Sequence, residues 1–136
     1  MKKVVSIILC AVILLSSVVI PAFAEEMQMS PRANNVAVTE SSFEIIDGNA
    51  VMCAMYRGYE GVTTGAHITI KLEKRSLLVF WNDITEFEIN HTGVNGAFER
   101  IYYSLEDGTY RATITYEISG SGGAADVIED VIKKSL

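Results

Sequence analysis

The sequence predicts an all-β protein, folded as an antiparallel β-sandwich of about seven strands. Three observations support this prediction. Short runs place apolar residues at alternate positions, most clearly from Thr109 to Ile118, and a period of two is typical of strands that bury one face. Turn-forming pairs such as Asp47-Gly48 and Asp107-Gly108 separate the runs. The runs recur at roughly 8–12-residue spacing, which is typical of sandwiches.

Residues 1–24 predict a secretory signal peptide that is removed on export. Lys2 and Lys3 are followed by an apolar run from Val4 to Ile20 and by small residues that end at Ala24. We therefore expect cleavage after Ala24 and a secreted, extracellular protein. The alternative is an uncleaved anchor, because the run of 17 residues is at the lower end of the roughly 17–25 residues that span a bilayer.

Cleavage would leave a single acidic domain. Removal of 24 of the 136 residues leaves 112, and the loss of Lys2 and Lys3 leaves 9 basic against 17 acidic residues, a net charge of −8 instead of −6. Such a charge disfavours binding to nucleic acid and, after cleavage, to anionic membrane surfaces. Cys10 leaves with the leader, so Cys53 has no partner for an internal disulfide, and its apolar neighbours predict that it is buried.

The mature chain is expected to begin with a flexible or loosely docked N-terminal arm over residues 25–41, which is polar and aperiodic. The β-sandwich domain is expected to follow over residues 42–136. Ala50 to Tyr56 is apolar at both parities, which predicts a strand buried on both faces or in a sandwich core. Lys74 to Ser76 is interpreted as a turn, and the apolar run from Leu77 to Trp81 as a strand. The other expected strands span residues 42–46, 66–73, 84–91, 98–105 and 109–118.

The C-terminal region leaves one alternative open. The glycines and serines of residues 119–123 predict a hinge. Beyond it, Val127, Ile128, Val131 and Ile132 fit either a short amphipathic helix or a final edge strand over residues 126–136.

Tyr110 adds a local signature at the start of the most regular strand, directly after Asp107-Gly108 and Thr109. In a tyrosine corner, a Tyr early in a sandwich strand packs its ring in the core and bonds its hydroxyl to backbone a few residues upstream. We therefore expect the sandwich to be immunoglobulin-like.

Three short motifs follow one another along the mature chain. Ser30-Pro31-Arg32 opens it, Leu72-Glu73-Lys74-Arg75 precedes Trp81, and Gly108-Thr109-Tyr110-Arg111 closes the core region. In this order the chain resembles a loose group of small secreted proteins of Gram-positive, Clostridia-like bacteria. It departs from the pattern of that group at three positions: Cys53, Glu73 and Phe87. The resemblance implies secretion and an immunoglobulin-like β-sandwich, and it carries over no catalytic residue.

No constellation of residues predicts catalysis, a cofactor or a metal site. His67 and His91 are the only histidines and lack the close spacing of zinc ligands. A small hydrolase that uses Cys53 with either histidine stays an alternative, because these residues could converge in space. A bacteriocin- or toxin-like effector with residues 126–136 as an amphipathic element is another.

Four residues are candidates for a binding surface. Glu86 and Glu88 share the outward face of one expected strand, where paired carboxylates could serve glycoside hydrolysis or calcium binding but more commonly form a solvated acidic face. Tyr59 is in a Gly-rich loop, and Tyr103 follows another tyrosine, so one of that pair must face away from the core. We therefore expect a non-enzymatic module that recognises an extracellular protein or glycan through the loops 58–65 and 92–96.

Overall fold

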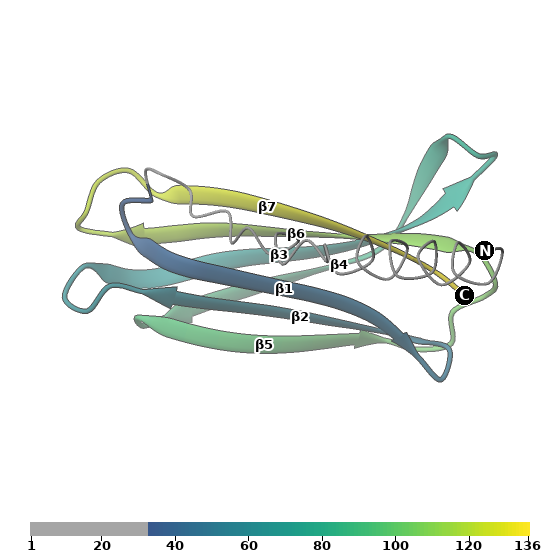
Figure 1. Cartoon of the computed structure of the whole chain (residues 1–136), viewed down its shortest axis with the longest axis horizontal. Helices are drawn as coiled ribbons and strands as arrows, with labels where there is room; N and C mark the ends of the chain where they lie inside the picture. The colour runs from purple at the N-terminus through teal and green to yellow at the C-terminus, as the bar shows by residue number, and fades with distance from the viewer. Residues whose placement is uncertain (1–32) are drawn as a thin grey trace, which may run out of the picture.

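Seven antiparallel strands form two sheets in the computed structural model, which describes residues 33–136 (Figure 1). The strands are β1 (Val36–Ile46), β2 (Asn49–Gly58), β3 (Thr63–Ser76), β4 (Phe80–Thr92), β5 (Asn95–Tyr102), β6 (Thr109–Gly120) and β7 (Asp126–Ser135). This confirms the predicted all-β sandwich. The predicted signal peptide and its cleavage site lie outside the described residues. Within residues 33–136, no helix has the length and apolar character needed to cross a membrane.

The strands are divided between the sheets in the orders β1-β2-β5 and β4-β3-β6-β7. In a constant-type immunoglobulin domain, the fourth strand joins the first, second and fifth. Here β4 instead continues from β3 as a long hairpin and pairs with it from Gly65↔Thr92 to Ser76↔Phe80. The sandwich therefore has three strands in one sheet and four in the other, and it differs from the constant-type immunoglobulin arrangement in the sheet that β4 joins.

The core lies between the sheets and is built from alternate residues, as the periodicity predicts. The inward residues of β3 and β6 are almost completely buried: Ala66, Ile68, Ile70, Leu72, Tyr110, Ala112, Ile114, Tyr116 and Ile118. Strand β2 buries only its even positions, from Ala50 to Tyr56. Of the two alternatives for this run, a strand in the sandwich core is confirmed. Burial on both faces is wrong, because the odd positions of β2 lie on the outer face of the three-stranded sheet.

The predicted tyrosine corner is confirmed. Tyr110 is 1 % exposed, and its hydroxyl donates a hydrogen bond of 2.6 Å to the carbonyl oxygen of Glu106. The ring thus belongs to the core, while the oxygen holds the connection between β5 and β6 against the start of β6.

The described part of the expected flexible arm belongs to the sandwich. Strand β1 begins at Val36, and the side chain of Asp126 accepts hydrogen bonds from the backbone N–H groups of Asn34, Asn35 and Val36 at 2.8, 2.6 and 3.0 Å. The side chain of Asn35 is itself buried and donates to the carbonyl oxygen of Ala124. Polar residues here do not indicate a mobile arm, because every one of these contacts satisfies a backbone group.

Asp126 also begins β7, which settles the alternative at the C-terminus in favour of an edge strand. Strand β7 pairs with β6 from Ile118↔Asp126 to Thr109↔Ser135. Further along the same edge, Ser41 of β1 donates a hydrogen bond of 2.6 Å to Asp130. Side-chain contacts of β7 therefore join the two sheets along β1.

The expected turn at Lys74–Ser76 and the expected strand at Leu77–Trp81 are both wrong. Strand β3 continues to Ser76, because Lys74 and Arg75 pair with Asn82 and Trp81 of β4. The chain reverses at Leu77–Val79 instead, so the apolar run that resembles a buried strand is a turn.

Candidate functional site

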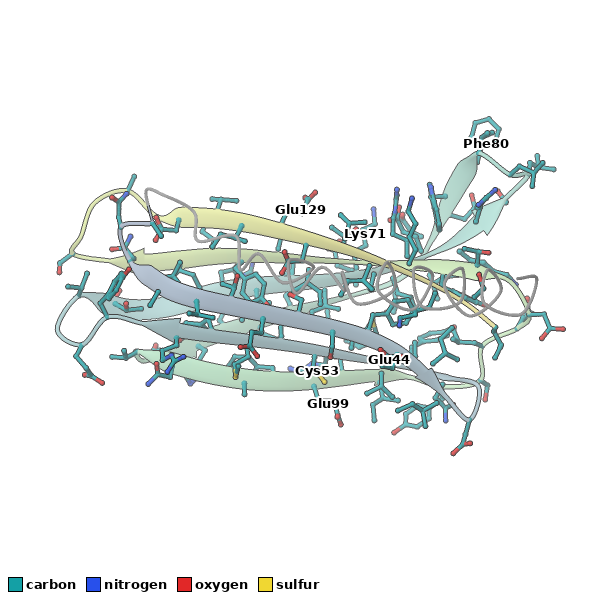
Figure 2. All side chains as sticks on the ribbon, in the orientation of Figure 1. Glu44, Cys53, Lys71, Phe80, Glu99 and Glu129 are labelled. Atoms are coloured by element: carbon teal, nitrogen blue, oxygen red, sulfur yellow. The ribbon has the colours of Figure 1, made fainter. Side chains whose placement is uncertain are left out.

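The β3–β4 hairpin extends beyond the rest of the sandwich and projects from one of its ends (Figure 1). Pairing of β3 with β6 ends at Lys74↔Tyr110, whereas pairing with β4 continues to Ser76↔Phe80. The last residues of the hairpin therefore have no third strand beside them. Figure 2 shows Phe80 at the end of this projection, clear of the sandwich body.

The tip of the hairpin consists of four consecutive apolar residues that face water. Leu77 is 84 %, Leu78 77 %, Val79 70 % and Phe80 61 % exposed. Exposed apolar side chains are ordinary when scattered singly, but a contiguous group of large ones marks a contact surface. We call these four residues, Leu77–Phe80, the apolar tip.

The turn residues are also unfavourable for the backbone. The φ of Leu77 is +46°, and that of Leu78 is +68°. Two successive residues with positive φ form the turn that favours Asn-Gly, because L-residues with a Cβ are strained in this left-handed region. Neither burial nor backbone geometry therefore explains leucine at these positions.

A β-bulge lies at the root of the hairpin. Leu72 pairs with Thr85 and Glu73 with Asp83, so that Ile84 is an extra residue on β4. A bulge bends its strand and increases the local twist. It therefore accounts for the direction in which the hairpin leaves the sheet.

The outer face of the hairpin root carries an aromatic ring between cations. The guanidinium carbon of Arg111 lies 4.4 Å, and the ammonium of Lys133 5.7 Å, from the centroid of the Trp81 ring. Arg75 is the cross-strand partner of Trp81. These four residues come from β3, β4, β6 and β7, so the whole four-stranded sheet positions the group.

The carboxylates at this root are paired with cations. Glu73 is buried, and its Oε2 accepts a hydrogen bond of 2.7 Å from Nε of Arg111 and lies 2.7 Å from Nη2 of the same guanidinium. Asp83 lies 2.9 Å from the ammonium of Lys71, and this hydrogen bond raises the pKa of Lys71. Within residues 33–136 no ion pair involves Arg75 or Lys133, so the root is locally cationic.

Of the predicted surface residues, Glu86 and Glu88 lie away from the apolar tip. Both are exposed on the outer face of β4, opposite Lys71 and Thr69 of β3. Glu86 lines a shallow polar hollow on this face, and Figure 2 shows Lys71 and Glu129 pointing out on the same side. The pair is thus part of a mixed-charge sheet face.

Tyr59 and Tyr103 are not brought together. They are 43 % and 67 % exposed and directly follow β2 and β5. Because β2 and β5 are antiparallel, the two tyrosines lie at opposite ends of the sandwich and cannot form one binding surface.

Cys53 is half-buried on the outer face of the three-stranded sheet, so the expectation that it is buried in the core is wrong. Its cross-strand partners are Ser42 and Glu99. His67 is on the outer face of the other sheet, with Nδ1 2.8 Å from Asn90, and the Nδ1 of His91 lies 2.8 Å from the Tyr56 hydroxyl. The sandwich separates the Cys53 thiol from His67, and His91 is bonded to Tyr56, so Cys53 forms a dyad with neither histidine.

The loops expected to carry binding are short, and backbone hydrogen bonds join them to each other. In the first, the hydroxyl of Thr63 accepts a hydrogen bond of 2.8 Å from the N–H of Tyr59. In the second, Gly93 and Val94 bond to Thr64 and Gly58. Both loops lie at the start of β3, opposite the end at which the apolar tip projects. Within residues 33–136, no group of three or more His, Cys, Asp or Glu residues is placed to hold a metal ion.

Comparison of the chain with protein-family models and with curated proteins gives no match. The site is therefore described from its own geometry. Sequence reasoning missed the apolar tip, although one signal pointed to it. The run from Leu77 to Trp81 is bounded closely by Lys74-Arg75-Ser76 and Asn82-Asp83, and polar residues so near on both sides suit a short exposed turn as well as a strand.

Proposed function

We propose that this chain is a secreted β-sandwich protein that acts by non-catalytic contact, as an extracellular recognition module, and that the apolar tip is its contact element. The observation that carries the proposal is the exposure of four consecutive large apolar side chains on a projecting hairpin. The expected signal peptide and the resemblance to small secreted proteins of Gram-positive bacteria support an extracellular role.

The shape of the hairpin supports contact rather than chemistry. A turn of this type is most stable with Asn-Gly, yet the chain has leucine at both left-handed positions. Residues that destabilise the local backbone conformation are expected mainly where function requires them. The described nucleophile and histidines, by contrast, form no catalytic arrangement near the tip.

The tip also has the advantage of reach. It stands clear of the sandwich, whereas Tyr59 and the two short loops lie at the other end of β3. A partner can therefore approach the hairpin without contacting the rest of the domain.

Labelled protein tests the proposal directly. In the mature chain Cys53 is the single cysteine, so a fluorophore attached there reports binding from the outer face of the three-stranded sheet, away from the tip. We expect saturable binding of the labelled chain to intact bacterial or host cells, or to arrayed extracellular proteins and glycans. The double variant Leu77→Asn with Leu78→Gly should lose at least about tenfold in affinity, since one buried leucine side chain is worth about a factor of ten.

The matched control is Val127→Asn with Val131→Asn, which removes two exposed apolar side chains from the outer face of β7. We expect this control to bind like the wild type. Equal binding by the hairpin variant, or no saturable binding to any of these surfaces, would refute the proposed role of the tip.

A further inference from the structure

We propose that the partner of the apolar tip is a phospholipid bilayer surface, into whose interface the hairpin inserts Leu77–Phe80 while its cationic root contacts headgroup phosphates. This inference rests on the proposed function, because it names the occupant of the same contact element. It replaces the expectation, drawn from net charge alone, that the secreted chain does not bind membranes.

The first argument is the shape of the contact element. The tip is a convex projection with apolar side chains around a tight turn. A protein partner would need a matching deep pocket to bury all four side chains, whereas a bilayer deforms around an inserted group. Amphipathic helices that lie in a membrane interface bury their apolar face to a depth of about 5–10 Å, which is comparable with the length of the three-residue turn and its flanking pair.

The second argument is the order of residue types along the hairpin. Behind the apolar tip comes Trp81, and beside Trp81 lie Arg75, Arg111 and Lys133. Trp is enriched at the level of lipid headgroups, and long cationic side chains extend to phosphates from that level. From the tip to the root, the hairpin thus carries apolar, aromatic and cationic groups in that order. A membrane interface has the matching layers in the same order: hydrocarbon, the headgroup boundary and phosphates.

The third argument is the distribution of charge. Six of the eight Lys and Arg residues between 33 and 136 lie on β3, β6 or β7 toward the hairpin end: Lys71, Lys74, Arg75, Arg111, Lys133 and Lys134. Four of these cations form ion pairs, Lys71 with Asp83, Lys74 with Glu106, Arg111 with Glu73 and Lys134 with Glu44. Within residues 33–136, Arg75 and Lys133 beside Trp81 are in no ion pair. The hairpin root therefore presents two cations without an ion pair, and the molecule can approach an anionic surface with its hairpin first although its net charge is negative.

The test uses the secreted chain and unilamellar vesicles of phosphatidylcholine, alone or mixed in equal parts with phosphatidylglycerol. Binding is measured by flotation and by the emission of Trp81, which is the single tryptophan. We expect the chain to float with the mixed vesicles, with a shift of Trp81 emission to shorter wavelength. Leu77→Asn with Leu78→Gly should lower the partition coefficient about tenfold for each leucine.

Charge variants separate insertion from general attraction. Arg75→Gln with Lys133→Gln should weaken binding to the mixed vesicles about fivefold for each charge and reduce its dependence on salt. The matched control Arg57→Gln with Arg100→Gln makes the same change of charge on the three-stranded sheet, and it should bind like the wild type. An equal loss in both charge variants would overturn the headgroup contact, because it would show attraction by net charge only.

The two proposals fail in different ways. If the wild type floats with neither vesicle type but binds cells or arrayed molecules through the tip, the bilayer is overturned and the occupant is a protein or glycan. If the hairpin variant floats like the wild type, insertion of the tip is overturned as well.

Discussion

Replacement of Leu77-Leu78 by Asn-Gly should make the protein more stable while removing its contact element. The perturbation keeps the length of the hairpin and its pairs Ser76↔Phe80 and Arg75↔Trp81. It changes only the two residues whose φ angles are +46° and +68°. Both positions point into water, so no core contact is lost.

The expected magnitude follows from the backbone. An L-residue in the left-handed region costs roughly 1–2 kcal/mol, and glycine at position 78 removes this cost, while asparagine at position 77 tolerates it better than leucine does. Glycine has a more flexible unfolded state, which offsets roughly 0.5–1 kcal/mol. The free energy of unfolding should therefore rise by about 1 kcal/mol.

Urea unfolding, followed by the fluorescence of Trp81 and by far-ultraviolet circular dichroism, measures the change. In a domain of this size, each kcal/mol corresponds to roughly 4–8 °C in the melting temperature. The matched control Leu77→Ala with Leu78→Ala removes apolar bulk but keeps Cβ atoms at both left-handed positions, so we expect no gain in stability. If the Asn-Gly variant is not more stable than the Ala-Ala variant, the turn is not strained. The argument that leucine is kept at these positions for function would then be refuted.

Three further predictions concern the buried polar groups. Tyr110→Phe removes the donor to the carbonyl of Glu106 and should lower the free energy of unfolding by about 1 kcal/mol, measured in urea. Asp126→Asn replaces a carboxylate oxygen that accepts from backbone N–H groups with an amide donor, and it should cost about 3 kcal/mol and speed amide exchange at Val36. Burial raises the pKa of Tyr116 to about 12. Because the tyrosine of the unfolded state loses its proton at lower pH, the free energy of unfolding should fall as the pH rises from about 10 toward 12. The fall should be shallower in Tyr116→Phe.

The regular elements could be predicted from the sequence because their physical cause is local. In β6, residues from Tyr110 to Ile118 alternate between buried and outward positions, and an Asp-Gly turn precedes them, so periodicity and turn chemistry agree. The tyrosine corner follows from the same local pattern. By contrast, β2 has apolar residues on both faces, so its sequence does not indicate which face packs in the core. That face is fixed by how β2 pairs with β1 and β5 in the sheet.

The candidate site could not be predicted, because it depends on where the long hairpin leaves the sheet. An apolar run is equally compatible with a buried strand and with an exposed turn, and only the pairing of Lys74 and Arg75 with β4 moves the reversal to Leu77–Val79. Similarly, the polar pair Asn34-Asn35 is typical of an exposed arm. Its backbone N–H groups are nevertheless bonded to Asp126, which lies more than ninety positions further along the chain. Contacts of such separation leave no trace in a local pattern.

The bonds from Asp126 to the first strand also bear on how the molecule is made. Three amide groups near the beginning of the domain stay without their acceptor until a residue 90 to 92 places later has been synthesised. A chain that emerges from its N-terminus, whether from a ribosome or through a translocation pore, therefore cannot complete its first sheet edge early. The N-terminal end of β1 is therefore among the last parts of the fold to gain its hydrogen bonds, although the rest of β1 pairs with β2, its neighbour in sequence.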